Sequence, residues 1–471
     1  MVMNRLELSP EQYRKLAHRV ADQTADFLKE LPQLPAFANT SGEEVNSVFE
    51  SALPERGLGE AAFDDLGRVL ELSRPPSPRF FGYVLGSGEP VGAIADLLVS
   101  VLNQNVTSWR SGPAAVTIER LVVRWLGEFI GCRGFAGSLT GGGSSANLMG
   151  LAIAREAKAP ANENGAQAGV IYTSTETHMS IPKAAALLGL GHSSVRLIGV
   201  DERFRIKLDE LKRAILEDRA AGKRGIAIVG SAGTTNTGSI DPLDALADLA
   251  EENDLWFHVD GAYGAFAAAP APEKFRGLSR ADSLSLDAHK WLYQALDCGC
   301  LLYRDQTAAQ KAFSHSGEYT KVLSSDPIEG FAFFEESMEL SRRFRALKIW
   351  LSLRYHGATA FRESIAEDMR LALHLASVIA GNEDMELLAP VELSAVCFRY
   401  KPAGKSEEEL NALNAEIVRR SQRAGRVFFS NAVIHGKFAL RACIVNHRTT
   451  QKDVEEVVRE TERVGSEIEG R

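Results

Sequence analysis

The sequence lacks any long uninterrupted run of apolar residues. Its longest apolar stretches, such as VGAIADLLVSVL at residues 91–102, contain a charge or polar breaks and are shorter than the roughly 20 residues needed to cross a bilayer. No apolar segment follows a basic start at the N-terminus, so a secretory signal peptide is not predicted. We therefore expect a soluble, cytoplasmic protein without a membrane partner.

Cysteine is also scarce, and acidic residues outnumber basic ones. The 471 residues include five cysteines, and the close pair Cys298 and Cys300 has a C-x-C spacing that matches neither a zinc site nor a C-x-x-C redox motif. Free thiols are expected, as in cytosolic proteins, and no metal site is predicted. The formal net charge of −9 argues against a nucleic-acid-binding surface.

The first 89 residues are predicted to be helical. Ser9, Pro10 and Gln12 form the start signal of a helix, with a capping box and a proline at the first helical position. Apolar residues then recur at helical spacing, which gives the helix one apolar face. A segment so poor in strands cannot build its own core. Its apolar faces must be buried against the main domain or against another chain.

Residues 90–347 alternate helical patterns with short apolar runs. This alternation predicts a large α/β domain with a mostly parallel sheet. Residues 348–471 have a different rhythm of helices and strands, which predicts a separate small α+β domain. The apolar runs of the large domain are AGVIYTS, SVRLIGV, GIAIVGSAG, LWFHVD, DSLSLDA and GCLLY.

A glycine-rich loop, GGGSSAN, precedes one of the predicted helices. Backbone N–H groups at a helix N-terminus bind anions, and glycines let a phosphate approach them. Ser144 and Ser145 could add hydroxyl donors. The loop lacks the lysine of a P-loop, and no G-x-G-x-x-G follows an early strand, so ATP and NAD are not indicated. By itself the loop suggests a small phosphate group, although many such loops are simple turns.

Chemically useful side chains follow several of the predicted strands, where the active sites of parallel α/β sheets lie. His178 follows VIYTS, Thr235 follows GIAIVGSAG, and Lys290 lies in LSLDAHKW. Asp260 ends LWFHVD and is followed closely by the small residue Ala262. Each has an ordinary structural explanation when taken singly. A lone histidine is usually structural, a strand-end aspartate can cap a helix, and a lysine can be a surface charge.

The combination suits pyridoxal phosphate. The amine of Lys290 can form a Schiff base, and the carboxylate of Asp260 can pair with the pyridinium nitrogen, which keeps the ring protonated as an electron sink. Ala262 can support one face of the ring and His178 the other. Their order and their positions at strand ends make coincidence improbable.

These stretches resemble the group II pyridoxal-phosphate-dependent amino-acid decarboxylases, and most of all their aromatic-L-amino-acid branch. The resemblance is carried by HVDGAYG, DAHKW and RRFRALKIWLSLRYHG, and it extends from SPRFFGYV to FALRACIVNHRTT. It implies an aspartate-aminotransferase-like fold-type I enzyme with a mostly parallel seven-stranded sheet and helices on both faces. It also implies a homodimer with active sites at the subunit interface, in which the N-terminal helices wrap the partner.

The resemblance implies decarboxylation of an L-amino acid, expected to be aromatic, to the amine and carbon dioxide. Lys290 is then the Schiff-base lysine and His289 its neighbour at the cofactor. His178 stacks on the ring, Asp260 binds the pyridinium nitrogen and Ala262 lies beside it. The phosphate loop and the surroundings of the ring are completed by Gly143, Ser144 and Thr235.

A further tyrosine matches the family's proton donor. In the family, a mobile loop before the RRFR stretch carries a tyrosine that protonates the substrate carbon after carbon dioxide leaves. Counting back from SRRFR places Tyr319, in HSGEYTKVLSSD, at that position. Relatives with phenylalanine there tend towards oxidative deamination to an aldehyde, so Tyr319 favours simple decarboxylation. Together with Lys290 and His178, it forms the expected catalytic set.

The sequence departs from the aromatic pattern at the expected substrate pocket and near the lysine. Tyr83 and Trp109 are kept as substrate residues, but residues 84–86 replace a typical Phe-Pro-Thr, and Arg110 is introduced. Arg110 can pair with an acidic or polar substrate group or can be a solvated charge. Asp287 stands where an asparagine is usual. A carboxylate would repel a phosphate, so Asp287 is given no phosphate role.

Three alternatives stay open. The same fold and cofactor could support an aromatic aldehyde synthase, or a decarboxylase of an acidic or other amino acid. The chain could also bind the cofactor and remain catalytically silent. The presence of His178, Asp260, Lys290 and Tyr319 argues against the silent protein.

Overall fold

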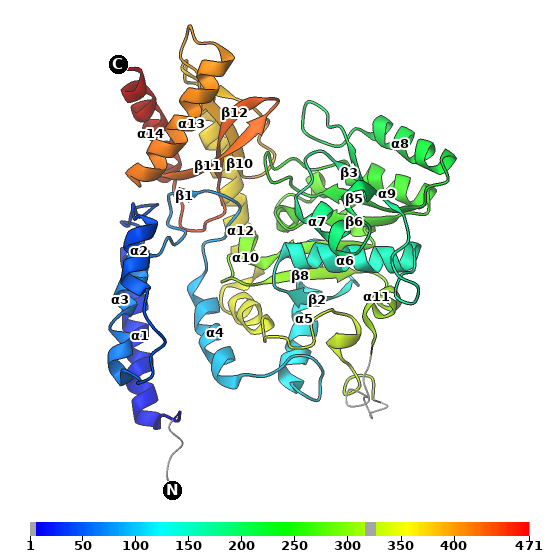
Figure 1. The fold of residues 1–471 in the computed structure, drawn as a ribbon, viewed down its shortest axis with the longest axis horizontal. Coiled ribbons are helices and arrows are strands. Elements are labelled where there is room, and N and C mark those ends of the chain that lie inside the picture. The colour runs from blue at the N-terminus through cyan, green and yellow to red at the C-terminus, as the bar shows by residue number, and fades with distance from the viewer. Residues whose placement is uncertain (1–5, 316–325, 471) are drawn as a thin grey trace.

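The computed structural model describes residues 6–315 and 326–470. Two sheets organise this part of the chain, one in a large domain and one in a small domain (Figure 1). Tyr319, the expected proton donor, lies outside the described residues. Among the helices that the structure describes, none is both long and apolar enough to span a bilayer.

The large domain is built on a seven-stranded sheet in the order β2-β8-β7-β6-β5-β3-β4. Strands β7, β6, β5, β3 and β4 run parallel to one another, and β8 runs antiparallel to both β2 and β7. This confirms the mostly parallel seven-stranded sheet and all of the apolar runs predicted to form strands. The strands are β2 (Ala136–Thr140), β3 (Val170–Ser174), β4 (Val195–Ile198), β5 (Gly225–Ser231), β6 (Trp256–Asp260), β7 (Ser283–Asp287) and β8 (Gly299–Tyr303).

Helices cover both faces of this sheet, because its strands carry apolar side chains on both sides. Helices α6, α7 and α11 pack on one face, and α5, α8 and α9 pack on the other. The short α10 follows β7 directly. These helices are α5 (Pro113–Phe129), α6 (Gly143–Lys158), α7 (Ser180–Leu187), α8 (Leu208–Ala220), α9 (Leu243–Glu252), α10 (Ala288–Trp291) and α11 (Gln306–Phe313).

The small domain has a five-stranded sheet in the order β1-β11-β12-β10-β9, with a hydrophobic core of its own. Its first strand comes from the N-terminal segment: Phe80 and Phe81 pair in parallel with Phe428 and Phe429. The segment 1–89 therefore contributes to this sheet, which its helical pattern did not predict. The elements are β1 (Phe80–Phe81), α12 (Ala346–Ala380), β9 (Met385–Leu387), β10 (Ala395–Tyr400), α13 (Glu407–Ala424), β11 (Phe428–Ile434), β12 (Lys437–Cys443) and α14 (Gln451–Glu469).

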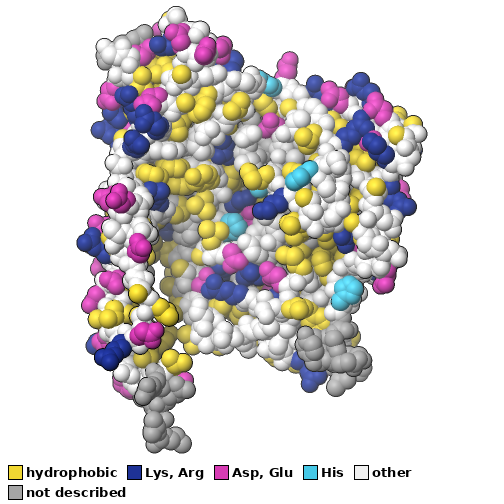
Figure 2. Space-filling model, viewed as in Figure 1, with side chains coloured by type: hydrophobic (Ala, Val, Ile, Leu, Met, Phe, Trp, Pro, Cys, Tyr) yellow, Lys and Arg dark blue, Asp and Glu magenta, His cyan; other side chains and the backbone are white. Residues whose placement is uncertain are grey.

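The N-terminal helices form a separate column beside α4 and the small domain (Figure 1). Helix α1 starts with the predicted capping box between Ser9 and Gln12, and none of its residues is buried. Apolar side chains line the hollow between this column and the main body (Figure 2). These elements are α1 (Pro10–Glu30), α2 (Gly42–Phe49), α3 (Leu66–Leu72) and α4 (Pro90–Leu102).

Candidate active site

The glycine-rich loop ends in a helix N-terminus without a side-chain cap. Gly142, the N-cap of α6, has φ 145° and no side chain that could accept a hydrogen bond from the first turn. A Cβ on Gly143 would lie 2.6 Å from the Cβ of Ala262 and 2.9 Å from Oδ2 of Asp287. Because Gly143 has no side chain, Ala262 after β6 and Asp287 at the end of β7 can pack against the N-terminus of α6. First-turn N–H groups with no side-chain acceptor are suited to an anion.

Lys290 lies in α10, directly beyond β7, and faces a buried carboxylate. Its Nζ is 2.9 Å from Oδ2 of Asp287, whose side chain is 3% exposed. The other oxygen of Asp287, Oδ1, is buried and has no hydrogen-bond partner. Asp287 thus lies between the lysine and the glycine loop, and in this structure it acts as the counter-ion of Lys290.

His289 is held in one tautomer by the backbone. The N–H of Cys298 donates to Nδ1 of His289 at 3.1 Å, so in the neutral ring the proton is on Nε2. Burial lowers the pKa of His289, which favours this neutral form. Its Nε2 lies 3.6 Å from Oδ2 of Asp287. The histidine, the lysine and the carboxylate therefore form one cluster at the end of β7.

Asp260 ends β6 and is buried, and its carboxylate accepts three hydrogen bonds. Its Oδ1 accepts from the N–H of Ala262 at 3.2 Å and from the hydroxyl of Ser285 at 3.1 Å. Its Oδ2 accepts from the amide Nδ2 of Asn147 at 2.9 Å. Three donors stabilise the ionised carboxylate and fix its orientation. This is the environment that a permanent anionic partner for a ring N–H requires.

His178 completes the cluster that the sequence predicted. Burial is the largest effect on its pKa, which is lowered, although the negative charge of Asp260 acts in the opposite direction. The positive charge of Lys290 also lowers this pKa, which places the imidazole within electrostatic range of both groups. The structure thus brings His178, Asp260, Ala262 and Lys290 together at the carboxyl ends of the strands.

Two of the remaining predicted residues lie at the rim of this cluster. Thr235 is half-buried in the loop after β5, and the carbonyl of its neighbour Asn236 accepts from Nε of Arg441 at 3.0 Å. The same guanidinium donates from Nη1 to the carbonyl of Tyr83 at 3.0 Å. Tyr83 is 62% exposed, and a few residues later the N–H of Gly86 donates to the carbonyl of His289 at 3.1 Å. The pattern did not reveal Arg441, because only the fold brings these segments together.

Trp109 lies in a different place. It lines a cavity of about 420 Å³ with Arg120 and Phe331, beside the edge strand β2. None of the predicted cofactor residues lines this cavity. Among the described residues, Lys290 does not line the cavity that Trp109 lines.

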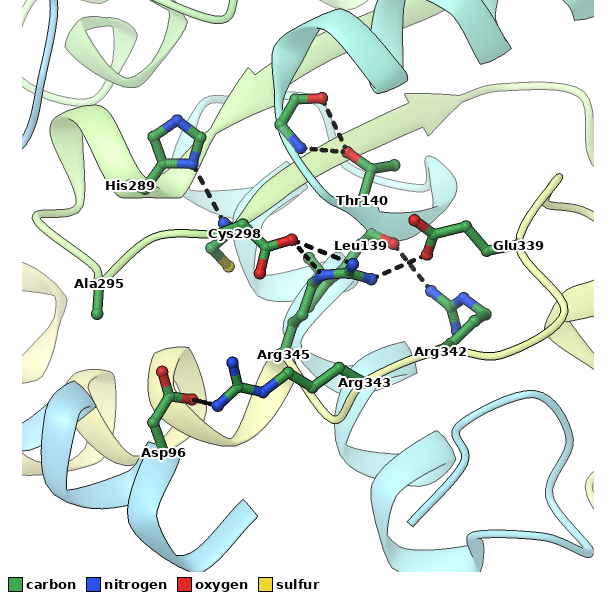
Figure 3. A network of polar contacts seen from close by, with 12 residues as sticks. Asp96, Leu139, Thr140, His289, Ala295, Cys298, Glu339, Arg342, Arg343 and Arg345 are labelled. Carbon is green, nitrogen blue, oxygen red and sulfur yellow. Dashed lines mark hydrogen bonds and ion pairs between the residues drawn. The ribbon is translucent and has the colours of Figure 1, made fainter. Parts of the chain in front are cut away.

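Three arginines in the SRRFR stretch anchor the segment around the site (Figure 3). Arg342 forms a fully buried ion pair with Glu119 of α5 and donates to the carbonyl of Leu139 in β2 at 2.9 Å. Arg343 pairs with Asp96 of α4 at 3.4 Å. Arg345, the third arginine of the stretch, forms two ion pairs, with Glu339 at 2.9 Å and with Asp297 at 3.1 Å.

The contacts of Arg345 link the SRRFR stretch to the residues around His289. Asp297 immediately precedes Cys298, whose N–H orients His289. A Cβ on Gly141 of the glycine loop would lie 3.2 Å from Oδ2 of Asp297. Arg345 therefore holds the segment that supports both His289 and the phosphate-type loop. The motif was visible in the sequence, but its spacing alone did not reveal these roles of the arginines.

The residues present fit pyridoxal phosphate. An uncapped helix N-terminus suits the phosphate, and a shielded primary amine suits the aldehyde. Between the loop and Lys290, Oδ1 of Asp287 is a buried polar atom without a hydrogen-bond partner, and a Cβ on Gly143 would fill the space beside Ala262 and Asp287. Asp260, with its three donors, suits a protonated ring nitrogen.

Comparison with known proteins gives consistent matches. Residues 44–401 match the model of the pyridoxal-dependent decarboxylase conserved domain. An aromatic-L-amino-acid decarboxylase of Bacillus atrophaeus is 35% identical over 470 residues, which cover 98% of this chain and 97% of that protein. A tyrosine decarboxylase of Petroselinum crispum is 32% identical, with 94% of this chain and 90% of that protein covered.

Solved structures are similar over nearly the whole chain. A structure of Oryza sativa TDC with PLP and tryptamine is 26% identical, with a TM-score of 0.91, and the match covers 99% of this chain and 100% of that chain. A structure of Rhodiola rosea 4-hydroxyphenylacetaldehyde synthase is 27% identical, with a TM-score of 0.88 and the same coverage. The overall fold is therefore shared by proteins named for two different reactions.

Proposed function

We propose that the substrate of this chain is an aromatic L-amino acid. The chain belongs to the family of pyridoxal-dependent decarboxylases. It is thus a lyase that removes the carboxylate of an amino acid with pyridoxal phosphate. The decarboxylases of Bacillus atrophaeus and Petroselinum crispum, both named for aromatic substrates and each at least 32% identical to this chain, support the proposal. The single structural observation that supports the decarboxylation chemistry is the cluster of Lys290, Asp260 and His178 at the strand ends.

When bound, pyridoxal phosphate supplies a protonated ring that accepts the electrons of the breaking bond to the carboxylate. Lys290 would hold the cofactor through its aldehyde. Asp260 would hold the proton of the ring nitrogen, and His178 and Ala262 would lie against the ring. The phosphate and the remaining surroundings of the ring are assigned to Gly143, Ser144, Thr235 and His289.

The last step needs a proton for the substrate carbon. Tyr319 is the proposed donor, supported by its sequence position before the SRRFR stretch. Tyr83 and Trp109 are proposed to contact the substrate side chain, with Trp109 acting in the site of the partner subunit. The cytoplasm is the proposed location, supported by five buried cysteines that are all free thiols.

We expect a homodimer, because α4 and α1 present apolar faces without a cover. Ile94 and Leu98 of α4 are 67% and 51% exposed, and Leu97 and Val101 are exposed as well. Apolar patches of this kind on a soluble protein mark an interface. Introducing Ile94→Asp and Leu98→Asp together should reduce the mass measured by light scattering from two chains to one and abolish activity.

Leu216→Asp provides the matched control for the dimer. Leu216 is an equally exposed leucine, 60% accessible, on α8 of the large domain, far from α4 in Figure 1. This variant should remain dimeric and active. A wild-type protein of single-chain mass, or a dimeric α4 double variant, would contradict the assignment.

Product analysis tests the reaction itself. The purified, cofactor-loaded protein should convert an aromatic L-amino acid into the amine and an equal amount of carbon dioxide, as measured by mass spectrometry and carbon dioxide release. Acidic and basic amino acids serve as the comparison. Aldehyde, ammonia and hydrogen peroxide in place of the amine would identify an aldehyde synthase, the reaction named for the Rhodiola rosea relative.

A further inference from the structure

Asn147 is a buried amide in α6 whose NH₂ group faces the candidate site. The residue is 1% exposed. Its Nδ2 donates to Oδ2 of Asp260 at 2.9 Å and to Oγ of Ser180 at 2.9 Å. Its Oδ1 lies 2.9 Å from Nε2 of His258. The amide thus uses both protons and its oxygen, and it joins three elements that are far apart in the sequence.

The direction of the bond to His258 follows from the chemistry of the partners. A carboxylate accepts only, so the NH₂ group of Asn147 must face Asp260 and its oxygen must face His258. Nε2 of His258 therefore carries a proton, and Nδ1 accepts from the hydroxyl of Ser283 at 2.8 Å. The Nε1–H of Trp256 donates to the same hydroxyl oxygen at 2.8 Å. Every proton in this chain points towards Asp260.

His258 remains neutral in this arrangement. It is fully buried, and burial lowers its pKa to about 4. The fold also leaves room for its ring, because a Cβ on Gly150, one turn after Asn147, would lie 2.6 Å from Cε1 of His258. The neutral ring therefore supports the orientation of Asn147 without adding a charge beside Asp260.

The second branch of the network reaches His178. The Oγ of Ser180 accepts from Asn147, so its own proton is available to Nδ1 of His178 at 2.8 Å. The backbone N–H of Ser180 also donates to Nδ1 at 3.2 Å. An Nδ1 that accepts two hydrogen bonds has no place for a proton. His178 is therefore held as the neutral tautomer with its proton on Nε2.

We propose that Asn147 is a positioning residue that sets both proton locations at the cofactor: it keeps Asp260 an acceptor for the proton on the ring nitrogen, and through Ser180 it keeps the proton of His178 on Nε2. The inference rests on the proposed role of Asp260 as the partner of the ring nitrogen. Burying an amide in a helix is unfavourable unless its groups are paired, and both groups that accept from Asn147, Asp260 and Ser180, lead to the site.

The test follows the ring nitrogen directly. Wild-type protein and Asn147→Ala are loaded with pyridoxal phosphate labelled with ¹⁵N in the ring, and the ¹⁵N chemical shift is recorded against pH. Without its bond from Asn147, Asp260 competes better for the shared proton. The ¹⁵N shift of the variant should therefore move towards that of the unprotonated ring across the pH range in which the wild-type ring nitrogen keeps its proton, and the cofactor should bind roughly tenfold more weakly.

Asn414→Ala is the matched control. Asn414 is also a fully buried asparagine in a helix, and it uses its amide for two bonds to the backbone of Tyr400 and one to Leu410. It lies in the small domain, so its loss should lower thermal stability but leave the ¹⁵N titration and the cofactor affinity unchanged. Asn147→Ser retains one donor in place of two and should titrate between the wild type and Asn147→Ala. Because serine is a milder change, it also serves if the alanine variant does not fold.

Asp260→Ala tests the role of Asp260 separately from the role of Asn147. If this variant loses the ring proton and Asn147→Ala and Asn147→Ser titrate like the wild type, the role of Asn147 is wrong and that of Asp260 stands. If the ring nitrogen also titrates normally in Asp260→Ala, the assignment of Asp260 is wrong, and the inference about Asn147 is overturned with it.

Discussion

Lys290→Ala should lower kcat/KM by about four orders of magnitude or more, because no other amine in the described cluster can bind the cofactor aldehyde. After reduction of the wild-type protein with borohydride, mass spectrometry should find the pyridoxyl group on the peptide that contains Lys290. The alanine variant should carry none. A reducible linkage at any other lysine, or turnover close to that of the wild type, would contradict the assignment.

Two further variants separate chemistry from stability in this experiment. Lys290→Ala leaves Asp287 buried without the ammonium group that lies 2.9 Å away, so the cofactor-free variant should also be less stable. Lys290→Arg retains a positive charge but cannot react with the aldehyde, so it should be more stable than Lys290→Ala and equally inactive. Lys183→Ala, which removes an exposed lysine on α7, should behave like the wild type.

Asp260→Asn should lower kcat by about a thousandfold with little change in fold. The asparagine has nearly the same shape and retains an oxygen for the bonds from Ala262 and Ser285. It loses the negative charge that holds a proton on the ring nitrogen, and a preorganised charge at this place is worth several kcal/mol. Steady-state kinetics at saturating cofactor, together with circular dichroism, measure both consequences.

Asp282→Asn is the control for the loss of a strand-end carboxylate. Asp282 precedes β7 and so lies at the amino-terminal ends of the parallel strands, opposite to Asp260. It accepts a hydrogen bond from the N–H of Phe257 at 2.8 Å and pairs with Arg304 at 2.7 Å. Asp282→Asn should lower thermal stability and leave kcat within a few-fold of the wild type. Equal losses of kcat in both variants would mean that Asp260 has a structural role only.

Most of the large domain could be predicted from local patterns. Apolar runs of five to nine residues became β3–β8, because a strand buried on both faces favours apolar side chains at every position. The capping box at Ser9 formed as expected, because its partners are three residues apart. The two short strands β1 and β9 were missed, since Phe80–Phe81 and Met385–Leu387 are too short to show a period and are defined by the strands they pair with.

The residues that carry chemistry, His178, Asp260 and Lys290, were visible in the sequence because each follows a strand in a parallel sheet, and the carboxyl ends of such strands share one edge. Their protonation states were not visible. Those depend on hydrogen bonds between residues as far apart as Asn147 and Asp260, separated by 113 positions, and on burial that the whole fold produces. Side-chain type and local spacing are properties of the chain, whereas a hydrogen-bond partner is a property of distance in space, and folding alone sets that distance.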